Sequence, residues 1–406
     1  MPWQPLLTGE LAARAVDAIR AIAGDIPRHP LRQPGLAGGD AGLALFYWYL
    51  ARAGEGGDDL AETYLEQAAD AMAEVALPPA LFGGYAGVAW TVEHLCSPPD
   101  QPLDETADPG ADIDDALLAL ASRSPWTESY DLIKGLVGIG VHALERRRRP
   151  GAAALLDRIA LRLAELAEPS GDGLVLWTPP EVLSAPARAR HPDGHCDLGV
   201  AHGMPAAIAL LASIDGDEAR RVREGLTRSM AAARRRAADG SLFPSSIDRR
   251  DPRPDTRCRA AWCYGDPGIA AALLRGARAA ADPSLEQLAL EAGRAAAART
   301  PVSAGVVDAG LCHGAAGLLH VFNRLYQATG DDAFRAAALG WAEDALARRA
   351  GGVGGYRSYQ PTEPSPWFDD AGFLTGAAGI GLALLAAVSD VEPRWDVALL
   401  CDVPPR

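Results

Sequence analysis

The chain has 406 residues, of which 49% are hydrophobic, and it carries a formal net charge of −15 at pH 7. This acidic balance argues against nucleic acid as a partner, because binding to the phosphate backbone needs a basic surface. Aromatic residues make up only 6% of the chain, and Ala, Leu, Arg and Glu favour helix over strand. The composition therefore predicts an almost all-α protein.

The sequence contains no secretory signal pattern and no run of eighteen apolar residues, so we expect a cytoplasmic protein without membrane insertion. Its six cysteines are scattered and are expected to be reduced. Cys96 and Cys401 are interpreted as structural. Cys196 and Cys258 are interpreted as bystanders of any site, with a free thiol near the site as the alternative for Cys258.

Charged segments with apolar residues at three- and four-residue spacing predict exposed helices with one buried face. In chain order they cover 9–24, 59–76, a weaker 112–123, 152–168, 217–238, 284–300 and 332–350. The basic run Arg146–Arg149 ends at Pro150 and is interpreted as a solvated helix end, with a partner-docking patch as the alternative.

A short glycine motif recurs seven times, and each copy is followed by an apolar stretch. The copies begin at Gly39, Gly84, Gly135, Gly203, Gly265, Gly314 and Gly376, and only the fourth lacks a second glycine, with Ala206 in its place. A helix that is apolar nearly all round must be buried. Each repeat is therefore predicted to pair a polar-faced outer helix with an apolar inner helix that opens at the glycines.

Seven inner helices can be buried together if they form a ring that the seven outer helices cover. We therefore predict a single domain over 1–406 with an α/α toroid fold, and an open solenoid is the main alternative. The loops before the inner helices would all face one end of the barrel. Long connections at 97–112, 170–195, 240–258 and 351–372 are candidates for functional loops.

Three of the glycine loops carry unusual residues at matching positions: Ala201-His202-Gly203, Cys263-Tyr264-Gly265 and Cys312-His313-Gly314. Thiolate and imidazole are ligands that zinc prefers, and a catalytic zinc keeps its fourth position open. Cys263, Cys312 and His313 are therefore predicted to hold one Zn²⁺. The competing interpretation is that each cysteine is a small buried hydrophobe.

Four further residues near these loops are candidates for acid–base chemistry. His202 could be a fourth ligand, a structural histidine or, as we prefer, a proton-transfer group. Asp131 is either a helix N-cap or the partner of a catalytic residue. Arg259 and Tyr264 could supply a proton or bind a developing anion. His94, His142, His191, His195 and His320 lack the loop position and are interpreted as structural or surface residues.

Together these motifs resemble the lanthionine synthetase C-like family, the stand-alone cyclases of lantibiotic (lanthipeptide) biosynthesis. The residues that carry the resemblance are YDLIKG at Asp131, AHG at His202, WCYG at Cys263 and CHG at Cys312, on seven glycine-punctuated repeats.

The resemblance implies an α/α toroid that binds zinc through Cys263, Cys312 and His313 and assigns proton handling to His202 and Asp131, with Arg259 and Tyr264 as further site residues. It also implies intramolecular Michael addition of cysteine thiols to dehydroalanine or dehydrobutyrine. The expected partner is a dehydrated precursor peptide, a complex with a lanthipeptide dehydratase stays open, and the chain itself is expected to be a monomer.

Three alternatives remain open at this stage. The first is a family member that adds glutathione to dehydroamino acids. The second is a zinc prenyltransferase-like protein, for which this chain has few aromatic residues. The third is a non-catalytic peptide-binding scaffold that zinc only stabilises.

Overall fold

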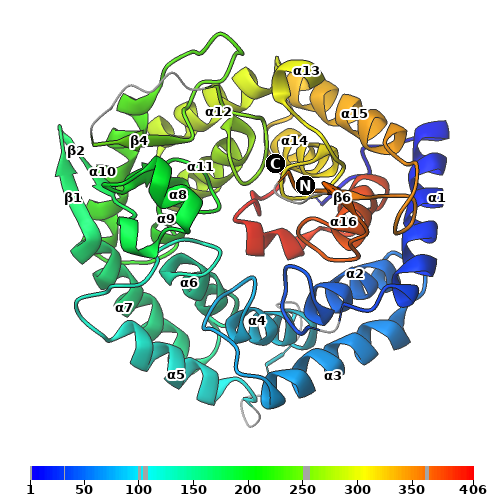
Figure 1. Ribbon diagram of the computed structural model, residues 1–406, viewed down its shortest axis with the longest axis horizontal. Coiled ribbons are helices and arrows are strands. Elements are labelled where there is room, and N and C mark those ends of the chain that lie inside the picture. Colours follow the sequence, from blue (N-terminus) through cyan, green and yellow to red (C-terminus); the bar gives the residue numbers. More distant parts are fainter. Residues whose placement is uncertain (1, 32, 99–101, 104–107, 250–256, 362–364) are drawn as a thin grey trace.

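Two concentric rings of helices make up the computed structural model, which describes residues 2–31, 33–98, 102–103, 108–249, 257–361 and 365–406 (Figure 1). The inner ring consists of α2 (Asp40–Arg52), α4 (Tyr85–Cys96), α6 (Leu136–Glu145), α9 (Met204–Leu211), α11 (Asp266–Ala280), α14 (Ala315–Thr329) and α16 (Ala377–Val388). The outer ring consists of α1 (Gly9–Asp25), α3 (Asp58–Glu74), α5 (Ala111–Ala121), α7 (Pro150–Leu166), α10 (Asp217–Ala233), α12 (Pro283–Ala297) and α15 (Asp332–Ala347). The predicted all-α toroid is confirmed.

The two rings differ in how much of each helix is buried. In α16 every residue from Ala377 to Ala387 is buried, whereas α3 buries only Ala61, Tyr64 and Ala68. These three positions are spaced three and four residues apart, as expected for one face of an exposed helix. Within the described part of the chain, no helix is both long and apolar enough to cross a bilayer.

The inner ring is closed. Each inner helix contacts the next inner helix along the chain, and the last, α16, contacts the first, α2. The first outer helix, α1, packs against α16 and so completes the double layer at the junction. This closure distinguishes a toroid from an open solenoid, in which the first and last repeats do not meet.

Backbone hydrogen bonds tie the glycine loops together at one end of the barrel. The residue two positions before the first glycine of a loop pairs with its counterpart in the next loop. The bonds run from Ala37 N to Phe82 O, Phe82 N to Ile133 O, Ala201 N to Cys263 O, Cys263 N to Cys312 O, Cys312 N to Leu374 O and Leu374 N to Ala37 O. Residues at the same position of different loops are therefore neighbours in space.

The glycines are required where an inner helix passes close to its own loop. A Cβ on Gly317 would lie 1.9 Å from the carbonyl oxygen of Leu311, and one on Gly268 would lie 1.9 Å from that of Trp262. Neither distance is possible for a real side chain. Gly265 also has φ of +113°, a conformation that favours glycine.

Short elements lie in the connections between the ring helices. They are two short helices, α8 (Ala185–Arg190) and α13 (Pro301–Ala304), the 3-10 turns Ile26–Arg28 and Pro180–Val182, and three antiparallel two-stranded sheets. The sheets pair β1 (Ala167–Ser170) with β2 (Gly173–Leu176), β3 (His195–Asp197) with β4 (Ser246–Asp248), and β5 (Ser358–Tyr359) with β6 (Trp367–Phe368). In the second sheet His195 lies opposite Asp248 and Asp197 opposite Ser246. Three of the predicted long connections thus carry structure of their own.

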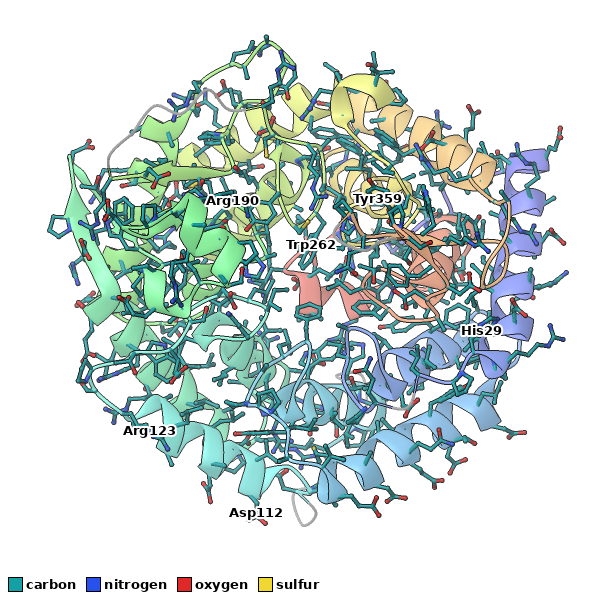
Figure 2. All side chains as sticks on the ribbon, viewed as in Figure 1. His29, Asp112, Arg123, Arg190, Trp262 and Tyr359 are labelled. Atoms are coloured by element: carbon teal, nitrogen blue, oxygen red, sulfur yellow. The ribbon has the colours of Figure 1, made fainter. Side chains whose placement is uncertain are left out.

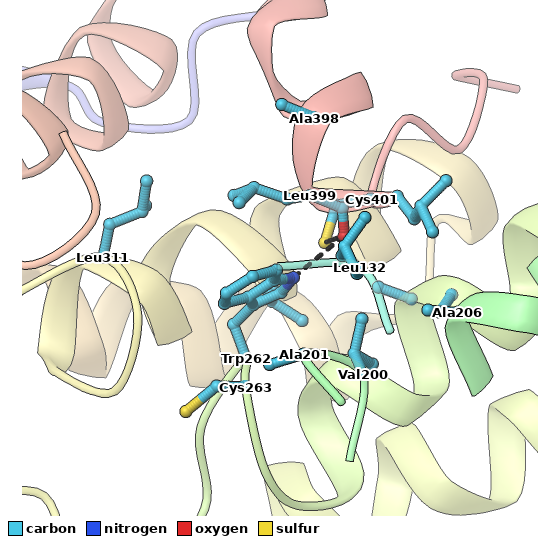
Figure 3. Close-up of a cluster of buried hydrophobic side chains, with 14 of the residues drawn as sticks. Leu132, Val200, Ala201, Ala206, Trp262, Cys263, Leu311, Ala398, Leu399 and Cys401 are labelled. Atoms are coloured by element: carbon cyan, nitrogen blue, oxygen red, sulfur yellow. Dashed lines mark hydrogen bonds between the residues drawn. The ribbon is translucent and has the colours of Figure 1, made fainter. Parts of the chain in front are cut away.

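The C-terminal segment fills the middle of the inner ring. Its 3-10 turn, Arg394–Leu399, lies at the centre of the view in Figure 1. The indole Nε1 of Trp262 donates a hydrogen bond of 2.9 Å to the carbonyl oxygen of Leu399, while Cys263, the next residue, directs its sulfur away from this apolar cluster (Figure 3). One short loop thus contributes one side chain to the core and one to the mouth.

The prediction of a solvated helix end at Arg146–Arg149 agrees with the exposure of Arg147 and Arg148 but is wrong for Arg146 and Arg149. The Arg146 side chain is buried and pairs with Glu93, Asp108 and Asp114 at 2.6–2.9 Å. Arg149 is also buried and pairs with Glu93 at 3.2 Å. Buried charges require such partners, and these come from three separate segments, so Arg146 and Arg149 are part of the packed wall.

Candidate active site

Cys263, Cys312 and His313 come together at the mouth of the barrel. Cys263 lies in the loop before α11, and Cys312 and His313 lie in the loop before α14. The hydrogen bond of 3.2 Å from Cys263 N to Cys312 O fixes the two loops against each other. The two Sγ atoms and one ring nitrogen of His313 all lie within 4.8 Å of one another.

This donor set fits a metal ion of zinc's type. Two sulfurs and one imidazole are soft and borderline ligands that suit tetrahedral zinc, and three protein ligands leave one position for another molecule. Cys263 is buried and the His313 side chain is 20% exposed, so the group is accessible on the histidine side. These three residues could hold a metal.

Asp308 lies beside the group. One of its carboxylate oxygens is 3.6 Å from Nε2 of His313, and the other accepts a hydrogen bond from Gly310 N. The backbone N–H of Tyr359 also donates to Asp308, at 3.0 Å. A carboxylate next to a histidine ligand is a common arrangement that orients the ring.

The electrostatic environment favours a thiolate on Cys263. A hydrogen bond from the Cys312 thiol, helped by His313 and the positive charge of Arg259, holds the pKa of Cys263 well below its usual value despite burial. The same pairing raises the pKa of Cys312, with burial as a further cause. Burial opposes protonation of His313, but Asp308 and Cys263 outweigh it and raise the pKa of His313 to about 9.

A pocket of about 610 Å³ opens next to this group. Its wall includes Asp131, His202, Asp197, Arg259 and Tyr264, together with residues of α8 and of the segment around β4. Figure 2 shows Trp262, the residue before Cys263, near the middle of the ring, with Arg190 toward the rim. The pocket thus adjoins the sulfur group through Arg259 and Tyr264.

His202 and Asp131 form a close pair in the pocket wall. Nδ1 of His202 lies 2.7 Å from Oδ2 of Asp131, and Oδ1 of Asp131 accepts a hydrogen bond of 2.8 Å from Lys134 N. The Asp131 side chain is 5% exposed and that of His202 is 40% exposed. A carboxylate only accepts hydrogen bonds, so Nδ1 carries the proton and Nε2 is left for another partner.

The charge of Asp131 controls the proton affinity of His202. Burial alone would lower the pKa of His202, but the hydrogen bond and negative charge of Asp131 outweigh it and raise that pKa. For Asp131, burial would raise the pKa, but His202 and the Lys134 N–H outweigh it and lower the pKa. The pair therefore stabilises the protonated imidazole and the ionised carboxylate relative to the same groups apart.

Tyr264 is anchored by a different carboxylate. Its hydroxyl donates a hydrogen bond of 2.6 Å to Oδ2 of Asp197, and Oδ1 of Asp197 accepts one of 2.7 Å from Gly199 N. The rings of Tyr264 and His202 lie 6.1 Å apart. Burial, with the charge of Asp197, raises the pKa of Tyr264 far above its usual range. Tyr264 therefore keeps its proton and directs it at Asp197.

Arg259 places a positive charge between the pocket and the sulfur group. Its Nη2 lies 3.4 Å from Sγ of Cys263, and the residue also lines the pocket. A guanidinium in this position stabilises negative charge on either side of it.

Comparison with known proteins identifies the family in which this architecture occurs. A protein-family model described as lanthionine synthetase C-like protein matches residues 31–400. The chain belongs to the lanthionine synthetase C-like family. A solved structure titled "Nisin cyclase" is similar to this chain with a TM-score of 0.74 and 20% identity, over 94% of this chain and 97% of that one, so the two share a fold.

A second structure, "Crystal structure of sugar epimerase from ruminal bacterium", aligns over 94% of this chain and 98% of that one. Its TM-score is 0.42 and its identity 11%, a likeness too distant to bear on this fold or its activity.

In this lanthionine synthetase C-like chain, Asp197 and Asp308 are site residues that the sequence reasoning missed. Each lies six residues before the first glycine of its loop, at Gly203 and Gly314, and Asp370 holds the same position before Gly376. Each Oδ1 accepts a hydrogen bond from the N–H two residues later, which closes a tight turn. The shared spacing was a signal that could have found them.

The remaining histidines separate into two groups. His94, His142 and His320 are buried and hydrogen-bonded to Glu145, Asp114 and Asp396, which agrees with a structural role. His191 and His195, by contrast, line the pocket, with ring centroids 4.3 Å apart. The sequence predicts structural or surface residues here, because neither histidine lies in a glycine loop. The β3–β4 pairing, which leaves no motif in the sequence, brings them to the mouth.

The remaining cysteines carry no disulfide. Cys96, Cys196, Cys258 and Cys401 all have free thiols. Cys258 lines the pocket, and burial raises its pKa to about 12. It is therefore a neutral thiol beside the site.

Proposed function

We propose that this chain is a zinc-dependent lanthipeptide cyclase that closes (methyl)lanthionine rings by intramolecular addition of cysteine thiols to dehydroalanine or dehydrobutyrine. The observation that carries the proposal is one arrangement: a Cys₂His group beside a pocket in which a carboxylate holds a histidine. Membership of the family and the fold shared with nisin cyclase support a cyclase.

Zinc is the proposed metal, held by Cys263, Cys312 and His313. When bound, it would lower the pKa of a substrate thiol so that the thiolate is present at neutral pH. Asp308 would orient the ring of His313 from outside the ligand set.

The chain's own residues then handle the remaining charge and protons. As the substrate sulfur forms its bond with the β-carbon of the dehydro residue, the π electrons move to the amide oxygen. Arg259 supplies the positive charge that stabilises this enolate. Its contact with Cys263 keeps the guanidinium at the boundary between the ligand group and the pocket.

His202 is the proposed proton donor to the α-carbon. Asp131 accepts the hydrogen bond from Nδ1, so the imidazolium presents its Nε2 proton to the substrate. Delivery of this proton from one fixed side sets the new stereocentre. The substrate thiol loses its proton to solvent before it attacks. After His202 has protonated the α-carbon, the neutral imidazole takes up a proton from solvent, which restores the imidazolium.

Tyr264 is proposed to shape the pocket opposite His202. Because its hydroxyl already donates to Asp197, the ring is held at a fixed distance from the imidazole. Its role is to position the substrate beside the imidazole of His202, in the pocket that both residues line.

Two measurements on the same samples test the proposal. Zinc content is determined by elemental analysis of the wild type and of Cys263→Ala, Cys312→Ala and His313→Ala. Ring closure is followed by mass spectrometry after alkylation, because a cyclised cysteine no longer takes up the alkylating reagent. We expect about one zinc per wild-type chain, lost in each variant together with ring closure.

A folded wild type without zinc, or with zinc but without ring closure on dehydrated peptides, would contradict the proposal. Glutathione added to the same assay separates the intermolecular reaction, because its adduct increases the peptide mass. We further propose that the peptide substrate comes from a separate lanthipeptide dehydratase.

A further inference from the structure

The walls of the pocket carry a charge opposite to that of the whole chain. The chain has a net charge of −15. Among the described lining residues, the four basic side chains of Lys134, Arg190, Arg257 and Arg259 face only two carboxylates, those of Asp131 and Asp197. The net excess is two positive charges (4 − 2), with the three lining histidines counted as neutral.

Both carboxylates are already engaged. Asp131 binds His202 and the N–H of Lys134, and Asp197 binds the hydroxyl of Tyr264 and the N–H of Gly199. Asp248, which lies beyond the lining, pairs with His191 at 2.9 Å. The described acids around the pocket therefore do not neutralise its arginines.

Two of the arginines have no partner within the described residues. Arg190, the last residue of α8, and Arg257, just before Cys258 in the wall, are both exposed and form no hydrogen bond or ion pair there. Nearby arginines behave differently. Arg188 donates to the carbonyl oxygens of Pro180, Glu181 and Leu183.

The two free guanidinium groups come from different parts of the wall. Arg190 lies on the short helix α8 and Arg257 on the segment that leads to Arg259 and Cys263. Figure 2 shows Arg190 at the end of α8. A peptide bound at His202 lies in the pocket that both arginines line.

We propose that Arg190 and Arg257 bind acidic side chains, Asp or Glu, of the peptide substrate near the residues that react. This inference rests on the proposed cyclase function and names the substrate class. A guanidinium binds a carboxylate through two parallel hydrogen bonds, which gives direction as well as attraction. The field of a basic pocket on an acidic protein also concentrates acidic peptides at the mouth while the remaining surface repels them.

Binding is measured first, because it does not depend on turnover. The probes are two fluorescent peptides with unreactive serine in place of cysteine and dehydroalanine, one with two glutamates beside the serines and one with two glutamines. The zinc-loaded wild type is compared with Arg190→Glu, Arg257→Glu, the double variant and Arg335→Glu. The last makes the same charge change on α15, away from the pocket.

The wild type is expected to bind the glutamate peptide about tenfold more tightly than the glutamine peptide, from two exposed ion pairs. The double variant should lose or reverse this preference, each single variant should lose part of it, and Arg335→Glu should keep it. Equal affinity of the wild type for both peptides, or an equal loss in Arg335→Glu, would overturn the proposal.

Cyclisation of the corresponding reactive peptides then shows where the effect lies. The ratio of KM for the glutamine peptide to KM for the glutamate peptide should fall severalfold in the double variant, with a much smaller change in the kcat ratio. If the wild type binds the glutamate peptide preferentially but closes no ring, the cyclase proposal fails while the acidic-peptide site stands. If the arginines affect only reaction with added glutathione, the anion they bind belongs to that thiol and the peptide proposal is wrong.

Discussion

His202 and Asp131, 71 positions apart in the sequence, are joined by a contact of 2.7 Å between Nδ1 and Oδ2. The carboxylate is almost fully buried and the imidazole is half exposed to the pocket. This asymmetry is useful for proton transfer, because the buried partner sets the charge state and the exposed partner can meet a substrate.

Replacing His202 by Asn should leave zinc content unchanged and lower the rate of ring closure by about 10²- to 10⁴-fold, the usual contribution of a general acid or base. Zinc analysis and the alkylation assay on one preparation check both parts. His191→Asn is the matched control, since His191 lines the same pocket and pairs with Asp248. A fully active His202→Asn enzyme would remove His202 from the mechanism.

The pH dependence of ring closure should follow the His202–Asp131 pair. The pKa of His202 is raised by Asp131, so the imidazolium persists above the ordinary histidine pKa of about 6.5. The stabilising contribution of the pair is present below that value and is lost as pH rises through the raised pKa. On the acid side it is lost as pH falls through the lowered pKa of Asp131.

Asp131→Asn removes the negative charge, so the alkaline limb of the kcat/KM profile should move to lower pH. The rate at that new optimum should remain measurable because the imidazole is still present. Profiles of wild type and variant over the same range test this. An alkaline limb at the same pH in both would show that another group sets it.

Asp308→Asn should weaken zinc binding by about 10- to 100-fold, because the carboxylate beside His313 orients the ring and raises its basicity. Competition with a coloured zinc chelator measures the affinity. Asp370→Asn is a close control: Asp370 has the same place in its loop and the same turn hydrogen bond, but no ligand histidine follows it. Equal losses in both variants would indicate a general effect on the loops.

Asp396→Ala should destabilise the fold by about 3–5 kcal/mol, because it leaves the buried charge of Arg324 with only the exposed Glu392 as its counter-ion. Asp396 is fully buried and accepts hydrogen bonds from Arg324 and from His320, at 2.6 and 2.8 Å. Urea unfolding measures the change. Glu55→Ala, which breaks an exposed pair with Arg20, should have a far smaller effect.

Much of the fold could be predicted from the sequence, because the glycine motif repeats in fixed register with the apolar periodicity. The predicted outer helix at 59–76 is observed as Asp58–Glu74, and that at 332–350 as Asp332–Ala347. The same register brought Cys263, Cys312 and His313 together, since the loop hydrogen bonds join equivalent positions.

What the sequence did not reveal depends on contacts between distant segments. Arg146 looks like a helix-end cation until Glu93, Asp108 and Asp114 are seen around it. His195 reaches the pocket only because β3 pairs with β4, about fifty residues later in the chain. The sequence also predicts that each outer helix pairs with the inner helix that follows it in the chain. Instead, the inner helix α2 packs on the following outer helix α3, and α1 packs on α16.

The packing of α1 on α16 also has a consequence for biosynthesis. A growing chain releases α1 from the ribosome first, but the surface that α1 covers is synthesised only when the seventh inner helix has appeared. Contacts between segments so far apart form slowly, and the apolar face of α1 has no permanent cover until they do. A closed ring also cannot gain or lose one helix pair without a change elsewhere. An open array can gain or lose a terminal unit, whereas here removal of one helix pair would separate the loop of Leu374 from that of Ala37 unless all the others shifted their angles.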